Sequence, residues 1–204
     1  AIERAKELED YCHRHLHKSK GKNSNKEVEL YRIFYYDCPP MEKKIYHPLL
    51  KRQVDFSKTE LYTWSIAFFE ELKKKRKFAL RMGKLADGQA HYTLKEKVLR
   101  ALCNGKTKFE DLTEQDFYIS VDQKGVDMKI GIDIASLAYK KQVDQIVLIS
   151  GDSDFVPAAK LARREGIDFV LDPLGAPIKP DLFEHIDGLR SCDKQYIEHF
   201  KKQQ

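Results

Sequence analysis

The spacing of hydrophobic and polar residues changes along the chain and predicts its elements. From Ile2 to about Lys18, apolar side chains recur every three or four positions, which predicts an amphipathic helix. Glu29–Tyr36 is rich in aromatic residues and is followed by a Pro-Pro pair, so it predicts a strand. The polar stretch Lys18–Lys26 and the Pro-containing, basic segment that ends near Phe56 are predicted to be loops.

Two Ser/Thr-x-x-Glu sequences in the middle of the chain are typical of helix starts. Ser57–Glu60 forms a capping box and predicts a helix that runs into a lysine-rich end. Thr93–Glu96 is a second capping box, and it predicts a helix that stops at Asn104-Gly105. The short apolar stretch Phe78–Met82 between them predicts a strand.

The carboxyl-terminal half alternates apolar strands with helices. The predicted strands are Phe117–Val121, Gln145–Ser150 and Ile167–Leu171, and the predicted helices are Val126–Lys141 and Asp154–Glu165. The last two strands are apolar throughout, which is typical of a parallel sheet that helices cover on both faces. The expected fold class is therefore α/β.

Composition narrows the class of protein. The chain has 204 residues, of which 42% are hydrophobic, so it is long and apolar enough to form a globular domain. No apolar run approaches the length of about 18 residues that a membrane-spanning helix needs. The 37 Lys and Arg against 32 Asp and Glu give a net charge of +5, which permits an anionic partner without requiring one. The four cysteines are far apart and form no CxxC pair, so we expect a reducing, cytoplasmic location.

Carboxylates gather where the predicted strands end. Asp152 and Asp154 follow the strand Gln145–Ser150, and Gly151 allows a tight turn between them and the strand. Asp127 lies at the start of the next helix upstream. Sites in open α/β sheets form beyond the carboxyl ends of the strands, so we expect these acids to converge on one crevice. Converging carboxylates repel unless a cation lies between them, and hard oxygen ligands favour Mg²⁺ or Mn²⁺.

Structural roles are the alternative for each acid. Asp127 and Asp154 occupy positions where N-cap residues are preferred, and Pro157 fits the first turn after Asp154. Asp152 has no evident capping role. Asp133 lies in an apolar run, about 240° round the helix from Asp127. We interpret Asp133 first as an orienting or hydrogen-bonding partner, and only second as a metal ligand.

The segment Gln123–Pro173 resembles the NYN domain, a branch of the PIN-like nucleases. The features that carry the resemblance are KGVD, a helix with IDIASLA, and SGDSDF after an apolar strand. YRIFYYDCPP, DFSKTELYTW and KPDLFEHIDGL extend it more weakly over most of the chain. The resemblance implies a three-layer, PIN-like (Rossmannoid) fold with a central, mostly parallel sheet flanked by helices. It also implies a metal-dependent ribonuclease site with Asp127, Asp152 and Asp154 at the family's metal-binding positions.

The chain departs from the family pattern at its amino end. NYN domains begin with an apolar strand that ends in Asp and lies centrally in the sheet, whereas this chain begins, without Met, at what corresponds to the following helix. We therefore expect residues 1–192 to form an NYN domain that lacks its first central strand. Residues 38–58 and 84–116 are expected to be loop or helical insertions, and 193–204 a helical tail.

Basic and hydroxyl side chains indicate where a substrate would bind. The candidate contacts are Lys124, Ser150, Ser153, Lys74 and Arg76. Lys124 is nearest in sequence to the acids and is placed to contact a phosphate. Lys74 and Arg76 belong to a basic run that suits a nucleic acid backbone. Such a run is also typical of a solvated helix end.

Three histidines near the amino end also invite interpretation as metal ligands. His13 and His17 are one helical turn apart, with His15 between them. Because Cys12 is the one further ligand nearby, we interpret the three as an exposed helix face.

We expect a ribonuclease in which Mg²⁺ or Mn²⁺ activates the attacking water. The alternative is a non-catalytic RNA- or protein-binding module that retains the same fold. A different Mg²⁺-dependent phosphotransfer enzyme fits less well, because the sequence contains no Gly-rich phosphate-binding loop. The expected partner is single-stranded RNA, with a second copy or another protein also open and no membrane association.

Overall fold

The computed structural model describes residues 1–16 and 28–192. The helices are α1 (Ile2–Arg14), α2 (Glu60–Lys73), α3 (Glu96–Cys103), α4 (Val126–Tyr139), α5 (Val156–Arg164) and α6 (Pro180–Phe183). The strands are β1 (Ile33–Asp37), β2 (Lys44–His47), β3 (Arg52–Asp55), β4 (Phe78–Met82), β5 (Lys84–Leu85), β6 (His91–Leu94), β7 (Phe117–Ser120), β8 (Gln123–Lys124), β9 (Gln145–Ile149), β10 (Asp168–Asp172) and β11 (Gly188–Leu189). Predictions for 17–27 and 193–204, including His17, the first loop and the helical tail, lie outside the described residues. None of the described helices is long and apolar enough to cross a bilayer.

Helices cover both faces of the first parallel sheet. β1 pairs with β4, with Ile33 opposite Phe78 and Asp37 opposite Met82. Side chains alternate along a strand, so Tyr35 packs with α1 and α2 while Tyr36 faces α4. The α/β class, with helices flanking parallel strands, is confirmed.

The second parallel sheet has the order β9, β10, β11. Three consecutive residues of β10, Phe169, Val170 and Leu171, are 0%, 5% and 0% exposed, so both faces of this strand are covered. Helices α4 and α5 supply most of the surrounding core. The uninterrupted apolar run predicts this environment, because a strand buried on both sides has no polar face.

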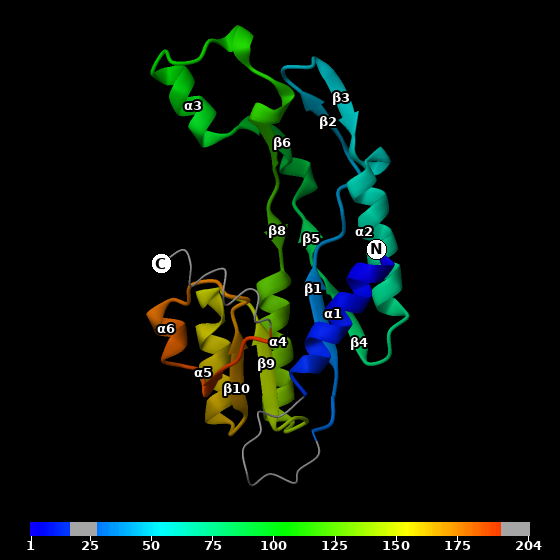
Figure 1. Cartoon of the computed structure of the whole chain (residues 1–204), viewed down its shortest axis with the longest axis vertical. Coiled ribbons are helices and arrows are strands. Elements are labelled where there is room, and N and C mark those ends of the chain that lie inside the picture. The colour runs from blue at the N-terminus through cyan, green and yellow to red at the C-terminus, as the bar shows by residue number, and fades with distance from the viewer. Residues whose placement is uncertain (17–27, 193–204) are drawn as a thin grey trace.

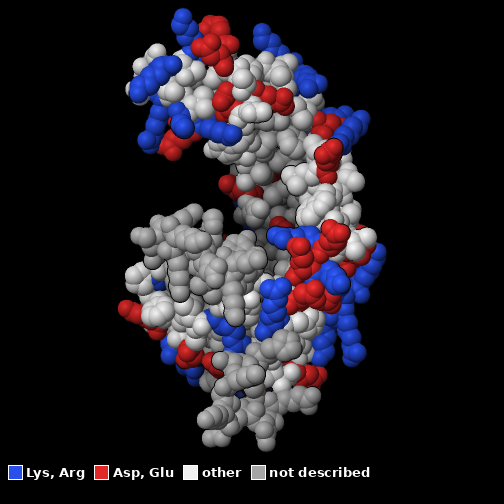
Figure 2. All heavy atoms as spheres, viewed as in Figure 1, with Lys and Arg blue, Asp and Glu red and all other residues white. Residues whose placement is uncertain are grey.

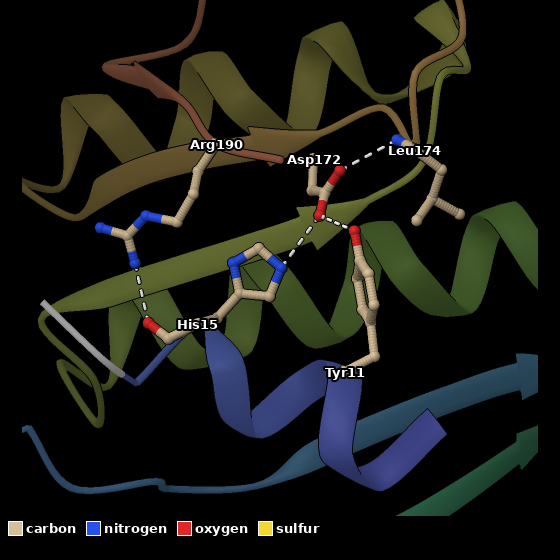
Figure 3. Close-up of polar contacts among 5 residues, drawn as sticks. All are labelled: Tyr11, His15, Asp172, Leu174 and Arg190. Carbon is tan, nitrogen blue, oxygen red and sulfur yellow. Dashed lines mark hydrogen bonds and ion pairs between the residues drawn. The ribbon is translucent and has the colours of Figure 1, made fainter. Parts of the chain in front are cut away.

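The two parallel sheets lie side by side but do not pair. β1 pairs with β4 alone and β9 with β10 alone among the described strands. The two strands run in the same direction, with α1 on one side of the space between them and α4 on the other (Figures 1 and 3). We call the unpaired sides of β1 and β9 the open edges.

An arm extends from the two parallel sheets and consists of β2, β3, β6, β7 and α3 (Figure 1). The segment before Phe56 was predicted to be a loop, but it contains the antiparallel hairpin β2–β3. The pattern KIYH alternates, with Ile45 and His47 buried and Tyr46 exposed. His47 contacts the Tyr92 and Phe117 rings at centroid distances of 4.1 and 5.1 Å, which joins the hairpin to β6 and β7.

Both predicted capping boxes are wrong in detail. Helix α2 begins at Glu60 with Thr59 as its N-cap, whose hydroxyl accepts the Tyr62 amide at 3.2 Å. Helix α3 begins at Glu96, and its N-cap Lys95 makes no side-chain capping bond. Thr93, the predicted cap, lies in strand β6 instead. The prediction that α3 ends at Asn104 is confirmed. Tertiary pairing therefore overrode the local capping signal at Thr93.

Candidate functional site

A tight turn after β9 presents two carboxylates. The Asp152 amide donates to Ser150 Oγ at 3.2 Å, and the Asp154 amide donates to Asp152 Oδ1 at 3.0 Å. Both aspartates are exposed. Ser153 begins a single 3₁₀ turn that leads into α5. The N-cap of α5 is Phe155, so the capping role considered for Asp154 is wrong, while the proline in the first turn is confirmed.

Helix α4 brings a third carboxylate to the same end of β9. Its N-cap is Gly125 rather than Asp127, with φ of 80° in the left-handed region that glycine adopts most easily. Asp127 is exposed in the first turn, and Lys124 is exposed on β8. Because α4 returns through a short connection into β9 and packs beside the turn after it, Asp127 lies at the carboxyl end of that strand (Figure 1).

The three acids share this end of the sheet without forming a close group. Among the described residues, one set of three or more His, Cys, Asp or Glu side chains has ligand atoms within 4.8 Å of one another, and it does not include Asp127, Asp152 or Asp154. None of these three carboxylates forms an ion pair within the described part of the chain. They are therefore available to a cation.

Asp133 has protein partners instead of facing these acids. Its Oδ2 accepts hydrogen bonds from Tyr36 Oη and from Arg81 Nε, both at 2.9 Å. The carboxylate therefore links α4 to β1 and to β4. Burial and then this hydrogen bond raise the pKa of Tyr36, so the phenol stays protonated and continues to donate.

Lys74 and Arg76 lie at the opposite end of the sheet. They follow α2 and precede the first residue of β4, whereas Asp152 and Asp154 follow the carboxyl end of β9 and Asp127 lies in the first turn of α4 near that end (Figure 1). Lys74 Nζ pairs with Glu71 at 2.6 Å on an exposed helix surface. The structure does not bring these two residues together with Asp127 or Asp152.

A buried polar cluster lies at the end of β10, and the sequence did not predict it. Asp172 is fully buried and accepts hydrogen bonds from Tyr11 Oη, from His15 Nε2 at 3.0 Å and from the Leu174 amide at 2.9 Å (Figure 3). The main-chain oxygen of His15 accepts a bond from Arg190 at 2.7 Å. His15 is 7% exposed, so the prediction of an exposed histidine face is wrong for this residue.

Electrostatics keep Asp172 ionised. Burial opposes its charge, but hydrogen bonds from His15, Tyr11 and the Leu174 amide outweigh burial and lower the pKa of Asp172. Burial, followed by the bond to Asp172, raises the pKa of Tyr11. Burial and then the Asp172 charge raise the pKa of the Cys192 thiol. The cluster therefore combines one carboxylate with a phenol and a thiol.

One signal for this cluster was present in the sequence. Asp172 comes directly after the apolar run Ile167–Leu171 and is the last residue of β10, so the rule about carboxyl ends of parallel strands applies to it as well. No local pattern connects Asp172 to His15, because 157 positions separate them. Cys192 likewise stands alone in the sequence.

Comparison with known proteins gives one family match. The model of the NYN domain matches residues 67–177, which is more than half of the chain and contains Asp127, Asp152 and Asp154. The uncharacterized protein y4oD of Sinorhizobium fredii is 32% identical over 81 residues, which are 38% of each chain. The match therefore covers well under half the length of that relative. No solved structure matches.

Proposed function

Since the chain belongs to the NYN domain family, within the PIN-like nucleases, we propose that it is a metal-dependent ribonuclease acting on single-stranded RNA. The observation that carries this proposal is the position of three unpaired acids. Asp127, Asp152 and Asp154 lie inside the matched segment and at the carboxyl end of β9. Ligands bind at this end of the strands in open α/β sheets.

The donor set suits Mg²⁺ or Mn²⁺. Three exposed carboxylates and the Ser150 hydroxyl are hard oxygen donors without nitrogen or sulfur among them. Asp127, Asp152 and Asp154 would hold the ion, directly or through water. Bound there, the ion would activate water for attack on phosphorus.

The chain's own residues orient the acids and the substrate. Ser150 Oγ and the Asp152 carboxylate each accept a hydrogen bond from a backbone amide of the turn, which fixes the path of the backbone between the two aspartates. Ser153 shapes the same loop. Lys124 is exposed two positions before α4 and would contact the scissile phosphate. Lys74 and Arg76, at the opposite end of the sheet, would contact a more distant part of the bound RNA.

The arm offers a second surface for RNA. Tyr46 is 56% exposed on β2, two positions after the exposed Lys44, and it lies opposite Gln53 in the hairpin. The next pair along the hairpin is His47 with the exposed Arg52. An exposed aromatic ring among basic side chains can stack a base while the cations contact phosphates. Figure 2 shows a hollow between the arm and the rest of the molecule, with charges of both signs around it.

A non-catalytic binding module is the second candidate. The observation that favours it is that the three acids do not all lie within 4.8 Å of one another, since no such group contains them in the described residues. A protein of this kind would bind RNA or another protein through the same fold without turnover. A second copy of the chain is one such protein partner.

We also propose that a further strand completes the domain between the open edges. In this arrangement residues 1–192 form an NYN domain whose central strand precedes α1, with 38–58 and 84–116 as insertions that build the arm. The unpaired sides of β1 and β9 support it, because buried backbone groups need hydrogen-bond partners.

The four free cysteines support a reducing, cytoplasmic location.

The proposal is tested by Asp152→Asn, which keeps the side-chain volume and removes the charge. We expect Mn²⁺-dependent cleavage of single-stranded RNA to fall by about a hundredfold or more, since electrostatic groups at an active site contribute on that scale. Asp144→Asn is the matched control, because Asp144 is exposed at the other end of β9. It should leave cleavage unchanged.

Two outcomes would contradict the ribonuclease. Equal cleavage by the wild type and Asp152→Asn would show that the Asp152 carboxylate takes no part in the reaction. Tight RNA binding without cleavage, with Mg²⁺ or Mn²⁺ present, would favour the binding module.

A further inference from the structure

Three potential metal ligands meet where α1, β10 and the segment after β11 come together. His15, Asp172 and Cys192 have ligand atoms that all lie within 4.8 Å of one another, and they are the one such group in the described residues. His15 and Asp172 are 157 positions apart. The fold, and no local sequence, assembles this group.

Hydrogen bonds and packing hold the ligands in place. His15 is 7% and Asp172 0% exposed, and Cys192 is partly buried. Tyr11 and the Leu174 amide position the Asp172 carboxylate, while Arg190 holds the backbone of His15 (Figure 3). A site whose ligands are already positioned loses little conformational freedom when it binds an ion.

One of the potential ligands has an unsatisfied polar atom. His15 Nδ1 is buried without a hydrogen-bond partner. Buried polar groups are normally satisfied, so this exception on a potential ligand distinguishes the cluster from an ordinary core.

We propose that His15, Asp172 and Cys192 form a Zn²⁺ site separate from the acids after β9. Imidazole, carboxylate and thiolate are ligands that zinc accepts together, whereas Mg²⁺ does not favour sulfur. The carboxylate and the thiolate together carry two negative charges, which neutralise one Zn²⁺. The fourth position of a tetrahedron is filled by Tyr11 Oη or by water.

The observed separations are compatible with such a tetrahedron. Zinc lies about 2.0 to 2.3 Å from its ligands, which places them about 3.3 to 3.7 Å apart. Atoms within 4.8 Å of one another reach this geometry through side-chain movements of about 1 Å. The Cys192 thiol loses its proton to solvent as the Zn–S bond forms.

The site would join the first helix to the end of the second sheet. α1 packs on α2 beside the first sheet, and its contact with the second sheet runs through Tyr11 and His15 to Asp172 (Figure 3). An ion bound there would hold the two sheets at a constant separation. This inference concerns different residues and a different metal from the ribonuclease, so either can fail without the other.

The test is zinc binding by the whole chain after chelation and buffer exchange. We expect one Zn²⁺ per chain by titration against a chromophoric chelator, and a thiolate-to-cobalt charge-transfer band after Co²⁺ substitution. His15→Gln and Cys192→Ser should each weaken zinc binding at least about a hundredfold, because even groups outside the ligand set change affinity by about 10- to 100-fold. Cys192→Ser should also abolish the charge-transfer band.

His13→Gln and Cys103→Ser are the matched controls. His13 lies on the same helix and bonds to the Glu9 carbonyl, and Cys103 is exposed on α3. Both should bind zinc as the wild type does. Zinc binding well below one ion per chain, or equal loss in Cys103→Ser and Cys192→Ser, would overturn the proposal. If a ligand variant does not fold, the wild-type cobalt spectrum decides, since a spectrum without the sulfur band excludes Cys192.

Discussion

Gly83 lies where three segments of the chain converge, between β4 and β5. A Cβ atom at this position would lie 2.7 Å from Val126 Cγ2, 2.8 Å from the Lys124 carbonyl oxygen and 2.9 Å from Cys38 Sγ. The Gly83 amide also donates to the Asp37 carbonyl at 2.7 Å. The close approach of these segments positions the start of α4, and with it Asp127.

Gly83→Ala should destabilise the protein by about 1–3 kcal/mol, because overpacking displaces backbone as well as side chains. Gly88→Ala is the control, since a Cβ there meets no atom within 4 Å. Chemical denaturation of both variants measures the change in the free energy of unfolding. Equal changes in the free energy of unfolding for the two substitutions would show that the close contacts at Gly83 do not restrict the size of this residue.

Two aspartates at strand ends differ in what their sequence neighbours reveal. The sequence marks Asp152 as a candidate ligand because it follows an apolar strand and has no evident capping role. Asp172 is the last residue of β10, yet its importance depends on His15 and Cys192, which the chain brings to it from opposite ends. Periodicity identifies which side of an element is buried, but not which distant side chain lies against it.

At the scale of elements, the junction of β3 and α2 shows how one helix start is made. Asp55 Oδ1 accepts from the Ser57 amide at 3.2 Å and from Ser57 Oγ at 2.6 Å, which stabilises a 3₁₀ turn before the helix. Thr59 then caps α2. The segment Ser57–Glu60 does precede a helix, as the sequence predicts. The role of each residue in it depends on strand β3, which leads into the helix.

Asp55→Asn should remove a pH-dependent contribution to stability. The Ser57 hydroxyl, more than any other group, lowers the pKa of Asp55 below its unfolded value of about 3.9. Its stabilisation is therefore complete above that value and is lost as pH falls through the folded-state pKa. Denaturation at several pH values should show a wild-type advantage at pH 7 that shrinks toward pH 3. An advantage that is constant with pH would contradict the assignment, and Ser57→Ala should reduce the same pH-dependent part.

At the scale of the whole molecule, the parallel strands form two sheets with the open edges between them. The sheets are joined by α4, which packs on both, and by the contact of α1 with Asp172. The Ser150 amide donates a hydrogen bond to the Asp172 carbonyl oxygen. The backbone amides of even-numbered residues in β9 therefore point to β10. By alternation, the amides of Val147 and Ile149 point to the open edge.

Hydrogen exchange can test whether these edges are open. We expect the Val147 amide to exchange at least about tenfold faster than that of Leu148, which bonds to β10 in the same strand. The Phe34 amide should likewise exchange faster than that of Tyr35, since odd-numbered residues of β1 bond to β4. Equal protection of neighbours in each strand would show that the edges are paired, and would contradict the proposed position for a further strand.

From the sequence one can predict the α/β class, the positions of the buried strands β9 and β10, and the turn that carries Asp152 and Asp154. These follow from local patterns, because apolar runs and turn residues act over a few neighbouring positions. The tertiary structure alone decided that Lys74 and Arg76 lie away from the acids, that residues 44–55 form a hairpin, and that His15 is buried against Asp172. Each of these depends on contacts between residues far apart in the chain, and no local pattern encodes which distant partner packs against a given side chain.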